Sequence, residues 1–428
     1  MPSGRAVRLK EPCARGRPVP RYPPQIEPDA SSRDPSTQPL GGRSAPGPLT
    51  LARTLFDMQP ARHSARDPES SLCSVRDDIG RRCCYPGWDN TSSLMRPSRL
   101  PLILGLILLV GGLGAASLVI GPAPIAPFRA LTALVSDQGS TTIVVRDIRL
   151  PRTALALLVG WIFGLTGAGL QGLLRNPLAD TAVFGAPQAA AFGAVLVIYS
   201  GLVGALSWAL PFAAILGALA SVALVVAVAG RRATVVVLVL SGLAVGGLAG
   251  AGTSLAISLS PNPFAVSEIV FWLLGSFEDR SIVHVWLAAP FILAASALVL
   301  SASNGLRALA LGEETARSLG VNVMRLRLLL VAGAAIGTGA SVAVAGSIGF
   351  VGLVAPHLVR PFVGYDPART LVPSGLAGAV LLLAADCAVR LIPSQTEVKV
   401  GVLTAILGVP FFLWVIARRK AELSEMPV

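Results

Sequence analysis

The chain has few of the residue types from which metal and disulfide sites are built. Its 428 residues include three histidines, His63, His284 and His357, which lie far apart in the sequence. A histidine-based metal centre is therefore not expected. The five cysteines are Cys13, Cys73, Cys83, Cys84 and Cys387, and the first four lack zinc-ligand spacing alongside histidines. Neither a zinc site nor a disulfide framework is predicted.

Lysine is also scarce, and this bears on nucleotide binding. The three lysines are Lys10, Lys399 and Lys420, and none of them completes a GxxxxGK[ST] loop. Such a loop cradles the phosphates of ATP with its backbone N–H groups and its lysine. We therefore expect no bound cofactor in this chain, and any ATP that drives its work must bind to another subunit.

Charged residues make up only 14% of the chain, whereas hydrophobic residues make up 53% and the mean hydropathy is +0.68. A water-soluble fold of this length could not cover so much apolar surface, so the chain is predicted to be a multi-pass membrane protein of the cell membrane. The net charge of +12 comes from arginines in an N-terminal extension and in short loops. We interpret them as topology signals and expect no nucleic-acid partner.

Residues 1–97 form the first predicted region. They hold 15 of the 33 prolines and no sustained apolar period, so this extension is predicted to be disordered. It lacks the pattern of a secretory signal peptide, and Met95, just before Arg96 and Arg99, is a candidate start of translation. Residues 98–428 are the predicted transmembrane domain.

Apolar stretches of about 20 residues recur from residue 100 onward, long enough to cross ~30 Å of hydrocarbon as helices. They predict an all-α bundle of about ten transmembrane helices. The expected spans are 100–119, 152–172, 182–201, 209–229, 233–258, 284–302, 327–346, 349–363, 371–391 and 399–417.

A cytoplasmic N-terminus agrees with most of the basic residues. It places Arg231, Arg232, the 307–327 loop, Arg360, Arg369 and the 418–420 tail in the cytoplasm, as the positive-inside rule requires. The exceptions are Arg146, Arg149, Arg152 and Arg390, which fall on the outer side. Either an acidic external partner or snorkelling to lipid headgroups would account for them.

Five motifs follow one another along the apolar region. They are RLPR at 149–152, Gln171 followed by RNPLAD at 175–180, LGEETARSLGV at 311–321, GFVGLVAPHLVR at 349–360 and GVLTAILGVPFFLWV at 401–415. In this order they resemble the FecCD family, the permease subunits of ABC importers for iron siderophores, haem and cobalamin. The resemblance covers the chain from Leu100 to its C-terminus. It implies a type II importer permease that pairs with a second, identical or related permease in the lipid bilayer, with two separate ATPase subunits and with an extracytoplasmic substrate-binding protein.

The resemblance assigns roles to two groups of charged segments. The 304–327 loop resembles the coupling helices that contact the ATPase subunits, although a solvated loop is the alternative. Its candidate coupling residues are Leu311, Gly312, Glu313, Glu314, Ala316, Arg317, Leu319 and Gly320. Arg149, Arg152 and Arg390 match positions that receive glutamates of the binding protein. Asp386 lies four residues before Arg390, so an intrahelical ion pair is a competing interpretation.

Two further motifs are expected to be structural. Gln171, Asn176 and Pro177 are predicted to form a corner at the end of a span. Pro356 and His357 resemble a packing motif, with the proline expected at a helix start and the histidine neither a proton relay nor a metal ligand. The chain departs from the family in two places. Thr181 follows the corner at a position where proline is common. Residues 397–401 read EVKVG where Glu-Leu-Pro-Val-Gly is usual, so Lys399 takes the place of the proline.

The sequence thus predicts a non-enzymatic permease of an ATP-driven importer that carries a ferric siderophore, with haem or cobalamin as alternative substrates. Its solute is expected to pass through a cavity at the dimer interface. A carrier driven by protons or sodium would need ionisable residues near the middle of the membrane, and Asp386 is the clearest of few. An intramembrane enzyme would need paired aspartates or a serine and histidine arrangement, which the spans lack.

Overall fold

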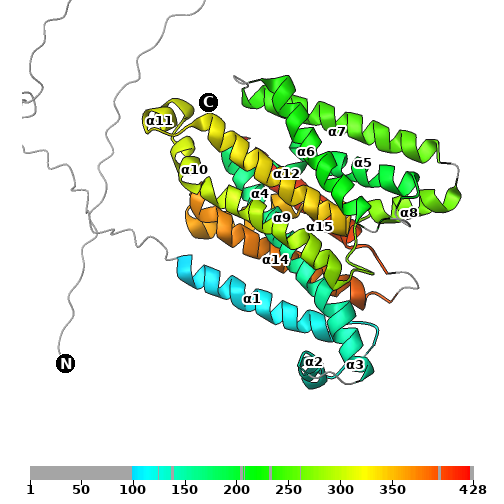
Figure 1. Ribbon diagram of the computed structural model, residues 1–428. Coiled ribbons are helices and arrows are strands. Elements are labelled where there is room, and N and C mark those ends of the chain that lie inside the picture. The colour runs from blue at the N-terminus through cyan, green and yellow to red at the C-terminus, as the bar shows by residue number, and fades with distance from the viewer. Residues whose placement is uncertain are drawn as a thin grey trace, which may run out of the picture. The chain divides into compact units, whose positions relative to one another are not determined.

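A computed structural model describes residues 99–424 except 124, 136–138, 203–205, 207, 231–233, 261 and 394–396. The extension predicted at 1–97 lies outside the described residues. Within them the chain forms helices and no strands, so the predicted all-α class is confirmed (Figure 1).

Eight helical segments of the described chain are long and apolar enough to cross a membrane. The longest runs from Ser140 to Leu173 and consists of α3 (Ser140–Ile143), a π-helical stretch (Val144–Arg149) and α4 (Leu150–Leu173). The others are α1 (Arg99–Val119), α6 (Ala209–Ala229), α7 (Val235–Ser258), α9 (Ile282–Ser301), α12 (Val323–Ala345), α14 (Pro367–Leu391) and α15 (Val400–Ser424). The chain is therefore a multi-pass membrane protein.

Two of the ten expected spans are shorter than predicted. The 182–201 stretch contains a 3-10 turn (Thr181–Phe184) and α5 (Ala186–Tyr199), because Gly185 turns left-handed at φ 69°. The 349–363 stretch contains α13 (Val351–Val359) and a 3-10 turn (Arg360–Val363), because Phe350 has φ 66°. The remaining helices are α2 (Pro127–Ala133), α8 (Pro263–Leu273), α10 (Ser303–Ala310) and α11 (Glu313–Ser318).

The centre of the bundle is formed by α4, α12 and α14 (Figure 1). In the most apolar stretch of α4 and of α12, 78% of the residues are buried, against 11% for α1. Helix α1 packs on α14 along one side and leaves most of its surface to lipid. The central helices thus hold the core while the peripheral ones meet the bilayer.

Glycines allow the central helices to touch at their backbones. A Cβ added at Gly164 of α4 would lie 2.0 Å from the carbonyl oxygen of Ser374 in α14, and one at Gly167 would lie 2.0 Å from that of Gly352 in α13. No side chain larger than hydrogen fits at such distances. Small residues are favoured between membrane helices because no hydrophobic force draws them together and close van der Waals contact must do so.

Gly164→Ala is therefore expected to lower the melting temperature of the detergent-purified protein, since overpacking costs about 1–3 kcal/mol. Gly111→Ala in α1 is the matched control, because nothing lies within 4 Å of its added Cβ. Melting followed by size-exclusion chromatography would compare the two variants. Equal melting temperatures would contradict the close contact between α4 and α14.

Candidate functional site

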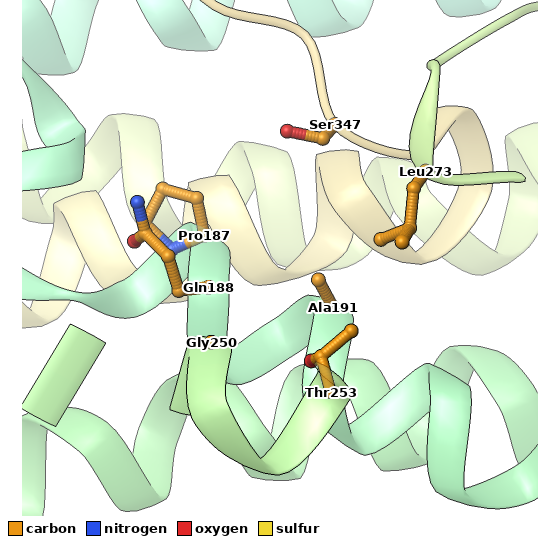
Figure 2. Close-up of a pocket in the computed structure, with 7 residues that line it drawn as sticks. All are labelled: Pro187, Gln188, Ala191, Gly250, Thr253, Leu273 and Ser347. Atoms are coloured by element: carbon orange, nitrogen blue, oxygen red, sulfur yellow. The ribbon is translucent and has the colours of Figure 1, made fainter. Parts of the chain in front are cut away.

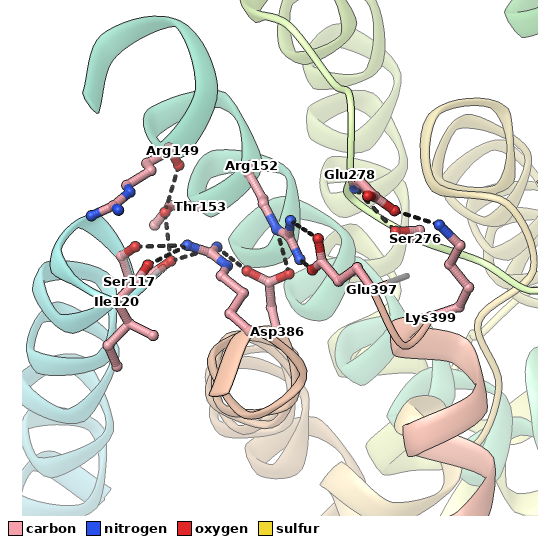
Figure 3. A network of polar contacts seen from close by, with 11 residues as sticks. Ser117, Ile120, Arg149, Arg152, Thr153, Ser276, Glu278, Asp386, Glu397 and Lys399 are labelled. Atoms are coloured by element: carbon pink, nitrogen blue, oxygen red, sulfur yellow. Dashed lines mark hydrogen bonds and ion pairs between the residues drawn. The ribbon is translucent and has the colours of Figure 1, made fainter. Parts of the chain in front are cut away.

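Three of the four arginines predicted on the outer side, Arg149, Arg152 and Arg390, lie in one polar network that joins four parts of the chain (Figure 3). Arg152 of α4 donates from Nε to Asp386 Oδ1 of α14 at 2.8 Å. It also donates from Nη1 to Glu397 Oε2 at 2.9 Å, and Nη2 binds the other oxygen of this carboxylate. The guanidinium thus forms a bidentate ion pair with Glu397, which precedes α15.

Arg390 continues the network from α14 to α1. Its Nη1 donates to the carbonyl oxygen of Ser117 at 2.8 Å and to that of Ile120 at 3.2 Å, and its Nη2 donates to Ser117 Oγ at 3.0 Å. Arg390 also pairs with Asp386, one helical turn earlier. The intrahelical pair considered from the sequence is therefore present, and fully buried Asp386 is shared between Arg390 and Arg152.

Arg149 binds carbonyl oxygens at and beyond the end of α1. Its guanidinium donates to the carbonyls of Leu118, Val119 and Ala123 at 2.9, 2.7 and 2.6 Å. Carbonyls at a helix C-terminus carry partial negative charge and lack partners within the helix, so a cation is well placed there. Arg149 and Arg152 are only 4% and 7% exposed, and in this structure both are occupied by partners within the chain.

Lys399, at the position where the sequence departs from the family pattern, forms an ion pair of its own. Its ammonium group binds Glu278 in the segment between α8 and α9 (Figure 3). The backbone N–H of Gly401 donates to the carbonyl of Gly275 in the same segment at 3.1 Å. The start of α15 is therefore tied to this segment by side chain and backbone together. Neither Glu278 nor Glu397 was singled out from the sequence, because their partners lie more than 100 residues away.

The predicted coupling loop forms α10 and α11, separated by Leu311 and Gly312. Gly312 has φ 117° and Gly320 has φ 80°, conformations that favour glycine, so each ends a short helix. Buried Ala316 holds α11 against the bundle, whereas Leu311 and Leu319 are 67% and 63% exposed at its two ends. The exposed Glu314 lies between them. Two large apolar side chains are thus exposed at the ends of this helix, on the side predicted to face the cytoplasm.

Ion pairs connect both short helices to long ones. Glu313 of α11 accepts from Arg317 at 2.7 Å and from Arg327 of α12 at 2.8 Å. Asp366 accepts from Arg307 of α10 at 3.2 Å through Oδ2, while its Oδ1 caps α14 by accepting from the backbone N–H groups of Ala368 and Arg369. A displacement of α10 and α11 would therefore act on α12 and α14.

A hollow of about 820 Å³ lies beside α11 on the same side. Its lining includes Thr234 and Val236 at the start of α7, Glu313 of α11, and Met324 of α12. The predicted coupling region thus consists of an exposed helix next to a recess, a shape suited to binding a partner protein.

The corner after α4 is held by Gln171. Its Nε2 donates to the carbonyl of Ala179 at 3.2 Å and lies 3.4 Å from the carbonyls of Gly352 and Leu353 in α13. Asn176 Oδ1 accepts from the backbone N–H of Leu178 at 2.9 Å, inside the turn that Pro177 begins. These contacts are those of a structural corner.

The sequence predicted Pro356 at a helix start, and this prediction is wrong. The proline lies inside α13, which begins at Val351. Proline has no N–H to donate to the carbonyl four residues earlier, which is that of Gly352. Gln171 donates to this carbonyl instead, so the missing helical bond is replaced by a contact between helices. His357 packs edge-on against Phe411 of α15, with ring centroids 5.5 Å apart.

A cavity of about 280 Å³ lies among α5, α7, α8 and the segment after α12, and three of its lining residues have polar side chains. Its lining residues are Pro187, Gln188, Ala191, Gly250, Thr253, Leu273 and Ser347 (Figure 2). Among the described residues, no group hydrogen-bonds the buried Oε1 of Gln188. An amide and two hydroxyl groups around one space are notable between apolar helices, where polar side chains commonly mark a solute pathway.

Arg152→Met is expected to lower the free energy of unfolding by about 3–5 kcal/mol, because it leaves Glu397 unpaired and buried Asp386 with one partner fewer. Lys399→Met, which breaks a partly exposed ion pair, should cost about 1 kcal/mol or less. Thermal melting of the two purified variants tests this difference. Similar losses from both would show that burial of the network contributes no extra stability.

Asp366 generates a prediction about pH. Burial alone would raise the pKa of this carboxyl, but the N–H of Arg369 and the guanidinium of Arg307 outweigh it and lower the pKa below its ordinary value. The stability that the carboxylate contributes is therefore present above about pH 4 and is lost as the pH falls through the lowered pKa. Asp366→Asn keeps a good N-cap but loses the charge. Its melting temperature should be below that of the unaltered protein at pH 7 and approach it toward pH 3; a constant difference would contradict the assignment.

Comparison with known proteins places these features in a family. The model of the FecCD transport family matches residues 106–418. The Fe(3+)-citrate import system permease protein YfmE of Bacillus subtilis is 37% identical over 329 residues, which cover 76% of this chain and 97% of that protein. The vitamin B12 import system permease protein BtuC of Citrobacter koseri is 38% identical over 277 residues, which cover 64% of this chain and 83% of that protein.

A solved structure supports the same conclusion. It is described as an inward-facing conformation of an ABC transporter of metal-chelate type, and it matches with a TM-score of 0.68 and 32% identity. The match covers 74% of this chain and 99% of that one. With its fold, its motifs and its relatives in agreement, the chain belongs to the FecCD transport family of membrane permeases.

Proposed function

We propose that this chain is the membrane permease of an ATP-driven importer and that it carries a ferric siderophore into the cytoplasm. The observation that supports this most directly is α11, an exposed helix joined by Glu313 to α12 and, through neighbouring α10 and Arg307, to α14. An importer powered by separate ATPase subunits needs such an element, because the force arises outside the membrane.

The ATPase subunits contact Leu311, Glu314 and Leu319 in this proposal. Exposed leucines at both ends of a helix are suitable anchors, since apolar side chains that fill pockets dominate binding energy at protein interfaces. The recess beside α11 receives part of the partner's surface. ATP is the cofactor of those subunits, and a second permease, identical or related, completes the passage.

The binding protein docks at the outer network through Arg149, Arg152 and Arg390. Because all three arginines are engaged within the chain, an incoming glutamate must compete with backbone carbonyls at Arg149 and with an internal carboxylate at Arg152 and Arg390. Glu397 is the most accessible candidate, since 21% of its side chain is exposed whereas that of Asp386 is fully buried. Docking in this scheme replaces Glu397 on Arg152 and releases the segment that leads into α15.

The cavity lined by Gln188, Thr253 and Ser347 is proposed as this chain's share of the solute path. A ferric chelate is favoured over cobalamin because the iron-citrate permease matches more of this chain, 76% against 64%. Polar groups that are few and dispersed would bind such a solute weakly, which assists release.

The proposal is tested in proteoliposomes that contain the permease, its ATPase and its binding protein. Uptake of radiolabelled ferric siderophore should require ATP, and Leu319→Ser should weaken ATPase binding by about 2 kcal/mol, or ~30-fold, and reduce uptake accordingly. Leu202→Ser, an exposed leucine beyond α5, is the matched control and should leave uptake unchanged.

Two outcomes would overturn this assignment. Uptake that follows a proton gradient and persists without the ATPase would identify an ion-coupled carrier. ATP-dependent uptake of cobalamin or haem, with none of ferric siderophore, would keep the importer and replace the substrate.

A further inference from the structure

A separate polar cavity of about 250 Å³ lies at the cytoplasmic ends of the central helices. Its lining includes Gln171, Arg175, Pro177, Arg360, Tyr365 and Thr370. The apolar span 140–173 ends here and the span 367–391 begins here. Since apolar spans end where hydrocarbon gives way to headgroups, the cavity lies at the level of the inner-leaflet headgroups.

The charges that line this cavity are positive. Arg175 and Arg360 are its only charged lining residues in the described chain, and Arg360 also has an interaction within the chain. The guanidinium of Arg175 has no ion pair or hydrogen bond to any described residue. Neighbouring Asp366 is occupied by Arg307 and by the start of α14. The cavity therefore suits an anion.

Arg175 occupies a backbone position that normally selects glycine. Its φ is 47°, and the N–H of Asn176 donates to the carbonyl of Gln171 while the N–H of Arg175 donates to that of Gly172. This is the Schellman ending of a helix, in which the residue at this position is usually glycine. The left-handed backbone conformation disfavours an arginine at this position. A favourable interaction of the side chain would offset this cost.

Gln171 supplies the second half of the site. The residue is 1% exposed, its Nε2 is occupied by backbone carbonyls, and its Oε1 is buried with no partner among the described residues. A buried acceptor left without a donor is destabilising. A ligand that offers a hydroxyl group would satisfy it, so the cavity suits an anion that also carries a hydroxyl.

The surface beside the cavity is apolar. Tyr365 and Phe362 are 68% and 61% exposed, and Leu358 of α13 is also exposed. Aromatic side chains concentrate where a membrane protein passes the headgroup region. Acyl chains attached to the anion would have a surface on which to lie.

We propose that this cavity binds the glycerophosphate headgroup of an anionic phospholipid such as phosphatidylglycerol. The phosphate faces Arg175 and Arg360, and a glycerol hydroxyl donates to Gln171 Oε1. Basic pockets between membrane helices on the cytoplasmic side are suited to anionic lipid headgroups. The bound lipid would brace the corner after α4 against the start of α14, next to α10.

The test uses the purified full-length permease in detergent and native mass spectrometry with added phosphatidylglycerol or phosphatidylcholine. Phosphatidylglycerol should bind preferentially, and Arg175→Gly should weaken it about fivefold. Because glycine suits this backbone conformation, the variant should melt at the same temperature or higher. Arg325→Gln removes an exposed arginine at the start of α12 and should leave binding unchanged.

Three results would overturn the proposal. Equal lipid binding by Arg175→Gly and the unaltered protein would exclude the site. Equally tight binding of free glycerol phosphate would make it a site for a soluble anion. Unchanged lipid binding together with weakened binding of the ATPase subunit would make Arg175 a protein contact.

Discussion

The buried carboxylate of Asp386 is the interaction on which the outer half of the molecule depends. It lies between Arg152 of α4 and Arg390 of α14, and those arginines bind Glu397 and the end of α1 in turn. A charge taken out of water is tolerated only when it is fully paired and hydrogen-bonded. The end of α1, α4, α14 and the segment before α15 must therefore come together in the folded protein, and the network sets the relative positions of their ends.

The two membrane faces are organised differently. At the end predicted to face outward, Arg152 and Arg390 form ion pairs with buried Asp386, whereas at the end predicted to face the cytoplasm α10 and α11 are held through the less buried carboxylates of Asp366 and Glu313. Exposed pairs are weaker and exchange partners at little cost. Between the faces, glycine contacts bring α4 against α13 and α14 at backbone distance. The fold is thus more rigid at its centre and at the Asp386 network than at α10 and α11, where a partner protein is proposed to bind.

Most of the helices could be predicted from the sequence, because a membrane span requires a continuous run of apolar residues. The apolar runs predicted the helices, and the four-residue spacing of Asp386 and Arg390 indicated their pair as one of two interpretations. The pair of Arg152 and Glu397 could not be predicted, since the two residues are 245 positions apart. The start of α13 at Val351 rather than at 349 was also missed, because Phe350, which turns the chain at φ 66°, is not a residue that signals a left-handed turn.

The proline within α13 has a mechanical consequence. A carbonyl that no helical N–H can reach remains open in every conformation of that helix, so the amide of Gln171, or a water molecule in its place, must accompany it. If the permease changes shape during a cycle, α13 and the lower part of α4 are expected to travel as one rigid unit. The hinges of such a motion would then lie at the turns around Gly346 and Phe350 rather than between these two helices.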